Sequence, residues 1–127
     1  MSAAEVETIM KKSLTALLLA AALPLTAYAH HSAARFDLTI RDRMVTGIVK
    51  EFKAANPHST IVLTITDEKG TRDVEFEGHS LNNYYRGGWR EGMVKVGDKI
   101  TLNAAPTKDG TDGGYALAVI AADGTRF

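Results

Sequence analysis

The sequence predicts an all-β fold, a small five-stranded barrel of the OB-fold type with Greek-key order and one short helix between its third and fourth strands. Three observations predict it. Short segments rich in β-branched residues recur along the chain, turn residues separate them, and one segment after the third of them breaks the strand period. Three strands, a helix and two strands is the order of an OB-fold. Another small β-barrel or an open β-sandwich is the alternative.

The first two predicted strands flank an Asn-Pro turn. Residues Met44 to Phe52 read MVTGIVKEF, and the glycine at position 47 indicates a bulge or bend. Ala54 to His58 reads AANPH and predicts a turn, because Pro57 disfavours helical angles at the residue before it. Ser59 to Thr66, STIVLTIT, is the clearest strand of the sequence.

A hairpin and a short helix follow. Asp67 to Gly70 is a tight-turn sequence, and Thr71 to Glu77 alternates apolar with acidic residues, as a half-buried strand does. Ser80 to Arg86 breaks this period. We expect Ser80 to cap a short helix there and Gly87-Gly88 to end it.

The last part of the chain supplies two more strands. We expect Trp89 and Met93 to pack the helix onto the barrel. Lys99 to Ala104 and Tyr115 to Ala121 are the predicted strands, and the glycine-rich loop Pro106 to Gly114 connects them.

Composition limits the functions that are open to this chain. Its 127 residues suit one small domain. Its formal net charge of zero shows no excess of positive charge of the kind that indicates binding to nucleic acid or anionic lipid. The absence of cysteine excludes disulfides, thiolate nucleophiles and cysteine-based zinc or iron–sulfur sites.

The N-terminal region has the pattern of a secretory signal peptide. Two lysines follow Met10, an apolar run covers Leu14 to Leu25, and Ala27-Tyr28-Ala29 is a small-x-small cleavage signal. A membrane anchor is the alternative, but the run is shorter than the ~20 residues that a span needs, and Pro24 interrupts it. We therefore expect cleavage after Ala29, no stable membrane span afterwards, and a periplasmic or secreted protein.

These signals divide the chain into three parts. Residues 1–29 are the predicted signal peptide, with Met10 as the expected initiator and residues 1–9 as an extension ahead of it. Residues 30–43 are polar and irregular and predict an extended segment. Residues 44–127 form the predicted barrel.

Several short motifs together resemble a known family. In chain order they are His30-His31-Ser32, Gly47-x-Val49, Asn56-Pro57-His58, Gly88-Trp89, Gly97-Asp98 and Pro106-x-Lys108-Asp109-Gly110. The set resembles a family of small exported bacterial proteins known as a domain of unknown function. One departure is Phe76, where many members have tryptophan. The resemblance implies export and a small β-domain, and it supplies no activity.

Cleavage after Ala29 gives the histidine at position 30 a special chemistry. An N-terminal histidine chelates one metal ion through its α-amine and its ring Nδ1 together, and the amine's pKa of about 8 lets a metal displace its proton at neutral pH. One more imidazole completes a three-nitrogen set, the histidine brace. Nitrogen ligation in a near-planar geometry favours Cu(II), with zinc or nickel less favoured.

The other three histidines are candidates for the remaining ligand. His58 is the strongest, because the Asn-Pro turn holds it at the start of a strand near the barrel mouth, and Asn56 is a candidate to orient an imidazole. His31 is weaker, because adjacent residues of an extended segment point to opposite sides. His79 follows the third strand and approaches the same end. The predicted function is metal binding, buffering or delivery.

A metal-free function stays open beside this one. The four histidines can be solvated or turn-capping residues, and the barrel then binds a periplasmic partner protein or a small ligand at its mouth. The candidate surface residues are Asn56, His58, Tyr84, Tyr85 and Trp89. In the simplest interpretation, however, Trp89 and one tyrosine belong to the core.

Catalysis without a metal has the weakest support. Glu75 and Glu77 lie two apart on one strand face, a spacing more typical of a wet sheet surface than of a carboxylate pair. Ser59 beside His58 makes no triad, because sequence adjacency is not geometry. We predict no catalytic residue, and oxidative catalysis at a histidine brace stays open.

Overall fold

The computed structural model describes residues 1–10 and 34–127. They belong to two compact units, Met1–Ala34 and Arg35–Phe127, and each is described by itself. The predicted signal peptide's apolar run and cleavage site, together with His30 and His31, lie outside the described residues. None of the described helices is both long enough and apolar enough to cross a membrane.

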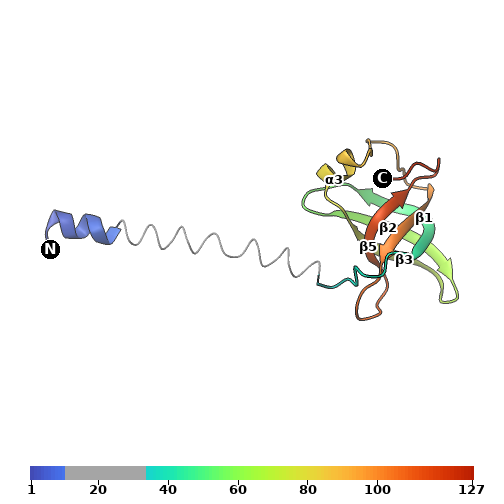
Figure 1. Ribbon diagram of the computed structural model, residues 1–127, viewed down its shortest axis with the longest axis horizontal. Helices are drawn as coiled ribbons and strands as arrows, with labels where there is room; N and C mark the ends of the chain where they lie inside the picture. The colour runs from blue at the N-terminus through green and yellow to red at the C-terminus, as the bar shows by residue number, and fades with distance from the viewer. Residues whose placement is uncertain (11–33) are drawn as a thin grey trace. The chain divides into compact units, whose positions relative to one another are not determined.

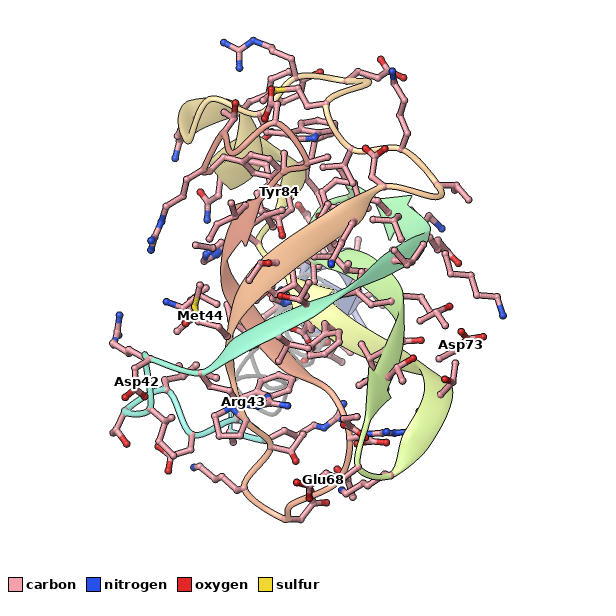
Figure 2. The ribbon with its side chains drawn as sticks, turned by 90° about the vertical axis from the view of Figure 1, so that its right-hand side faces the viewer. Asp42, Arg43, Met44, Glu68, Asp73 and Tyr84 are labelled. Carbon is pink, nitrogen blue, oxygen red and sulfur yellow. The ribbon has the colours of Figure 1, made fainter. Side chains whose placement is uncertain are left out.

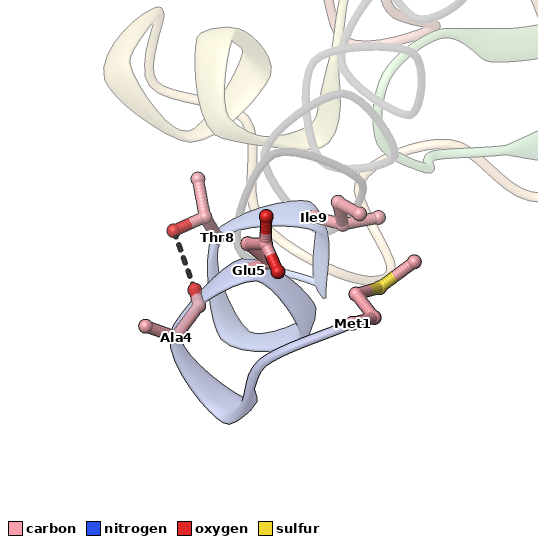
Figure 3. A pocket seen from close by; sticks show the side chains of 5 residues that line it. All are labelled: Met1, Ala4, Glu5, Thr8 and Ile9. Atoms are coloured by element: carbon pink, nitrogen blue, oxygen red, sulfur yellow. Dashed lines mark hydrogen bonds between the residues drawn. The ribbon is translucent and has the colours of Figure 1, made fainter.

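The described part of the first unit is a helix over residues 3–10. Its start is capped by Ser2, whose backbone N–H and hydroxyl donate to the Glu5 carboxylate at 2.7 and 2.9 Å. A shallow hollow lies along it, beside the Thr8 hydroxyl that donates to the Ala4 carbonyl at 2.9 Å (Figure 3). Among the described residues that line this hollow, Glu5 is the only one with an ionisable side chain.

The second unit is a closed barrel of five strands (Figure 1). The barrel order is β1-β2-β3-β5-β4, with β3 and β5 parallel and the other pairs antiparallel. This confirms the predicted barrel with a short helix between its third and fourth strands. The elements are β1 (Met44–Lys53), β2 (Ser59–Asp67), β3 (Gly70–Gly78), α3 (Leu81–Arg86), β4 (Lys99–Ala105) and β5 (Gly114–Ile120).

The barrel closes because β1 pairs on both sides. Its first half pairs with β4 and its second half pairs with β2, with Ile48 shared. Gly47 lies at this change of partner, where an added Cβ would lie 2.8 Å from the Ile65 Cγ2 and 2.9 Å from the Thr64 carbonyl oxygen. The bulge falls later, between Val49 and Glu51. Gly47 is therefore needed for the close approach of β2, and the bulge that it suggested lies further along β1.

The core follows the alternation of the strands. Most inward residues of β2 and β3 are apolar, with the buried Ser59 as an exception, and their outward neighbours are threonines or charged residues except for Val62. The fully buried side chains of the barrel include Val49, Ile61, Leu63, Phe76, Ile100, Leu102 and Val119. Burial of this set is the main stabilising contribution, at roughly 1.5–3 kcal/mol for each large apolar side chain.

Helix α3 closes one end of the barrel (Figure 2). The Ser80 hydroxyl accepts from the Asn83 N–H at 3.2 Å, and Gly87 ends the helix, as predicted. Tyr84 and Trp89 pack with the rings of Phe52 and Phe127, with centroid separations from 5.5 to 6.4 Å. We call Phe52, Tyr84, Trp89 and Phe127 the aromatic plug.

The segment before β1 is attached to the barrel. Phe36 is buried and bridges to Thr107, while the Asp37 N–H donates to the Pro106 carbonyl and the Lys108 N–H to the Arg35 carbonyl, both at 2.9 Å. The compact unit therefore begins at Arg35, whereas the sequence placed its start at Met44.

Candidate functional site

His58 lies immediately before β2 and its imidazole is held on one side. Its Nδ1 lies 3.2 Å from the Glu77 Oε1, and the side chain is 38% exposed. Among the described residues, Nε2 has no hydrogen-bond partner. A carboxylate beside Nδ1 favours the tautomer that carries its proton on Nδ1 and leaves the Nε2 lone pair available, an arrangement common at metal-binding histidines.

The register of the β2–β3 hairpin brings Glu77 to His58. Ser59 pairs with Gly78 and Thr60 with Glu77. Because side chains alternate across a strand, Glu77 points outward beside Thr60, on the same face as His58. The sequence assigned Glu77 to a wet sheet surface. The turn Asp67 to Gly70 is the sequence signal that could have identified this contact. The strand register set by that turn places Glu77 and His58 on the same face of the hairpin.

His79 lies opposite His58 across the same ladder and uses both ring nitrogens. Its backbone carbonyl accepts from the Ser59 N–H at 3.1 Å. Its Nε2 lies 3.1 Å from the Leu117 carbonyl and its Nδ1 lies 2.9 Å from the Tyr115 hydroxyl. A carbonyl only accepts, so we infer that Nε2 carries the proton and Nδ1 accepts from Tyr115. Metal binding by His79 would require the loss of one of these bonds.

These residues form one patch on the outer surface of β2, β3 and β5, which we call the outer-face cluster: His58, Glu77, Tyr115 and His79. Parallel pairing of Glu77 with Tyr115 joins its two halves. Burial raises the pKa of the Tyr115 hydroxyl, and the negative charge of Glu77 raises it further. Tyr115 therefore stays protonated at neutral pH and donates to His79.

The N-terminal segment reaches this patch. The Phe36 ring packs on Tyr115 with 5.7 Å between centroids. Arg35 and Phe36 line a hollow of about 60 Å³ together with Glu75, Glu77 and Asp112. His30 and His31, the other predicted ligands, lie outside the described residues, and of the predicted ligands the structure describes His58 and His79, which the β2–β3 register places opposite each other.

Asn56 has a different contact from the one predicted. Its Oδ1 accepts from the Asn82 N–H at 3.4 Å, and the neighbouring Ala55 carbonyl accepts from the Leu81 N–H at 2.9 Å. These bonds join the turn to the start of α3. The carboxylate that lies beside the His58 ring is that of Glu77.

Two of the five residues of the predicted ligand surface are internal, and the other three, Asn56, His58 and Tyr85, are exposed. Tyr84 is 1% exposed and Trp89 7%, so both belong to the core, as in the simplest interpretation of the sequence. Tyr85 is 43% exposed, with its ring edge-on to Trp89 and the Arg90 guanidinium 5.5 Å from its centroid. Within residues 1–10 and 34–127, no three His, Cys, Asp or Glu side chains group closely enough to hold a metal ion.

The comparisons with known proteins give a family and no activity. The model of a family of unknown function, DUF6152, matches residues 17–116, which is most of the chain. The chain therefore belongs to this family. No curated protein and no solved structure matches it.

Proposed function

We propose that this member of the DUF6152 family is an exported, periplasmic metal-binding protein that holds Cu(II) between the mature N-terminus and His58. The observation that carries the proposal is the His58 imidazole, which Glu77 holds through Nδ1 while Nε2 has no partner in the described residues. A carboxylate beside one ring nitrogen is a common support of metal-binding histidines.

The remaining donors come from the new N-terminus. Cleavage after Ala29 makes His30 the first residue, and its α-amine and Nδ1 then chelate one ion. With the Nε2 of His58 they give three nitrogen donors, a set for which Cu(II) stands highest in the Irving–Williams order. Zn(II) and Ni(II) rank lower, and His31 and His79 are auxiliary candidates.

The length of the chain is compatible with this site. Arg35 lines the same hollow as Glu77, which in turn contacts His58. His30 lies five residues before Arg35, and an extended segment of that length reaches about 16–18 Å. The attachment of Phe36 to Tyr115 starts this segment beside the outer-face cluster.

Local charge also supports a cation here. Among the described residues that line the hollow, Glu75 and Glu77 face one cationic side chain, Arg35, while the carboxylate of Asp112 is paired with Arg72. Excess negative charge attracts a divalent ion. The role is binding, buffering or delivery of copper.

The test is a copper titration of the correctly processed protein. It is expressed with its own signal, His30 is confirmed as residue one by mass spectrometry, and Cu(II) is followed by calorimetry and EPR. We expect one ion per chain with sub-micromolar affinity and nitrogen hyperfine structure. His58→Ala, and acetylation of the mature α-amine, each weaken binding at least tenfold.

A matched control keeps this result specific. Glu68→Gln removes a carboxylate from the hairpin turn at the other end of β3 and leaves copper binding unchanged. Micromolar or weaker binding, or equal binding by uncleaved protein, would rule out the proposed site.

The second candidate is a metal-free interaction module. The exposed Tyr85 ring, with Arg90 beside it, favours this alternative, because such a pair suits contact with a partner. A processed protein without copper affinity, and with a partner whose binding Tyr85→Ala abolishes, would establish it.

A further inference from the structure

A second cavity lies at the barrel end that holds the β2–β3 hairpin, opposite the aromatic plug. It measures about 350 Å³, at the small end of ligand pockets. Ile65 and Val74 give it an apolar floor, and Arg43, Lys69 and Arg72 are its cationic side chains. Figure 2 shows Arg43 at this end of the barrel and Tyr84 at the other. We call it the Arg43 cavity.

The guanidinium of Arg72, which lines the same cavity, is fully paired with carboxylates. Its Nε and Nη2 donate to the two oxygens of Asp112 at 2.6 and 3.0 Å. Its Nη1 and Nη2 donate to the two oxygens of Asp67 at 2.7 and 3.1 Å. Two bidentate carboxylates therefore neutralise Arg72 and cover two edges of its fork.

Arg43 lacks such a partner. Its Nη1 donates to the Gly113 carbonyl at 2.9 Å and is 3.5 Å from the Ala104 carbonyl. Within the part of the chain that the structure describes, Nε and Nη2 make no hydrogen bond and no carboxylate pairs with Arg43. The Nε and Nη2 edge of Arg43 is therefore uncovered, whereas Asp112 covers the same edge of Arg72. The cavity thus has three cationic and two anionic side chains.

The loop before β5 is shaped around Arg43. Gly113 and Gly114 have φ of +101° and +150°, and an added Cβ on either would collide with a backbone carbonyl, of Glu75 or Ala105 respectively. A Cβ on Gly114 would also lie 3.1 Å from the Arg43 Nη1. The two glycines let the Gly113 carbonyl reach Arg43 and hold its guanidinium in place, so the free edge is oriented before any ligand arrives.

We propose that the Arg43 cavity binds a small organic carboxylate. The Nε and Nη2 of Arg43 pair with its two oxygens, and a short apolar tail lies over Ile65 and Val74. A planar, bidentate anion fits this edge because the fork of a guanidinium matches a carboxylate. The site shares neither Arg43, Ile65 nor Val74 with the proposed copper site, so the two proposals stand or fall separately.

The test uses the full chain, labelled with ¹⁵N, and butyrate as the probe at constant ionic strength. We expect saturable shifts of the Arg43 Nε–H and of the Gly113 amide. Butyramide, which has the same tail without the charge, binds at least tenfold more weakly. Arg43→Gln lowers butyrate affinity at least tenfold, and Arg43→Lys does likewise because it keeps the charge and loses the fork.

The control is Arg41→Gln, which makes the same charge change on an exposed arginine two positions away and leaves affinity within twofold. If Arg43→Gln does not fold, the wild-type Nε–H signal and Arg43→Lys still decide the question. Absence of saturable shifts, or equal binding by either Arg43 variant, would refute the site. Tighter binding of inorganic phosphate than of butyrate would refute the carboxylate class.

Discussion

The aromatic plug and the outer-face cluster lie on either side of the same strand ends but use their side chains differently. In the plug, Tyr84 and Trp89 are almost wholly buried and contribute packing. In the cluster, His58 stays partly exposed with one nitrogen held and the other unpartnered among the described residues. The mouth where an OB-fold would bind a ligand is thus filled by the protein's own rings. The proposed metal ligand His58 lies instead on the outer face of the sheet.

The largest effect should come from breaking the plug. Trp89→Ala removes a core side chain that contacts Phe52 and Tyr84, and we expect a loss of about 3–5 kcal/mol in the free energy of unfolding. Urea unfolding measures it. Tyr85→Ala, on the exposed neighbour, should cost less than about 1 kcal/mol. Similar losses in the two variants would contradict the division between plug and surface.

The cluster should respond in copper affinity rather than in stability. Glu77→Gln keeps the size of the side chain but removes the charge that supports His58, and loss of such a support typically lowers metal affinity about 10–100-fold. Competitive copper titration of the processed protein measures this. Unchanged affinity would mean that Glu77 does not support a metal ligand.

Substitution of the two histidines of the outer-face cluster should separate a structural role from a metal-binding role. His79→Ala leaves the Tyr115 hydroxyl and the Leu117 carbonyl without their partner, and we expect a loss of about 1–3 kcal/mol in unfolding free energy. His58→Ala should change that free energy by less than about 0.5 kcal/mol. Urea unfolding without metal compares them. The reverse order would overturn the assignment of His79 as structural.

The smallest effect concerns the ion pairs at the hairpin end. The Arg72 guanidinium lowers the pKa of Asp67 to about 2 and lowers that of Asp112. A carboxyl with a lowered folded-state pKa binds protons more readily when unfolded, so its stabilisation is present above pH ~4 and is lost as the pH falls towards 2. We expect the melting temperature to fall less over this window in Arg72→Gln. An unchanged acid response would show that these exposed pairs do not contribute.

Most of the fold could be predicted because alternation and turn residues are local signals. The strands of the β2–β3 hairpin and the Ser80 cap lie within a residue of their predicted places, since each follows from neighbouring residues. The attachment of Phe36 could not be predicted in this way. Its partners, Thr107 and Tyr115, lie some seventy residues away and meet it only after the barrel has closed.

The candidate site likewise contains residues that local sequence signals predict and residues that they do not. His58 could be proposed from its turn, and Glu77 follows from hairpin register once the turn is known. The hydrogen bonds of His79 depend on the parallel pairing of β3 with β5, which no local pattern encodes. The role of Arg43 could not be predicted, because an arginine just before a strand is common on protein surfaces. Its place in the cavity depends on the closed barrel.

The docking of Phe36 has a kinetic and thermodynamic consequence for the proposed copper site. Because Phe36 is fixed on Tyr115, the point at which the preceding segment joins the barrel lies beside the outer-face cluster. Under the proposed cleavage after Ala29, His30 would be linked to His58 through few residues, and short linkers give effective concentrations in the millimolar range. Chelation would then be intramolecular and independent of protein concentration, which copper titration at several protein concentrations measures.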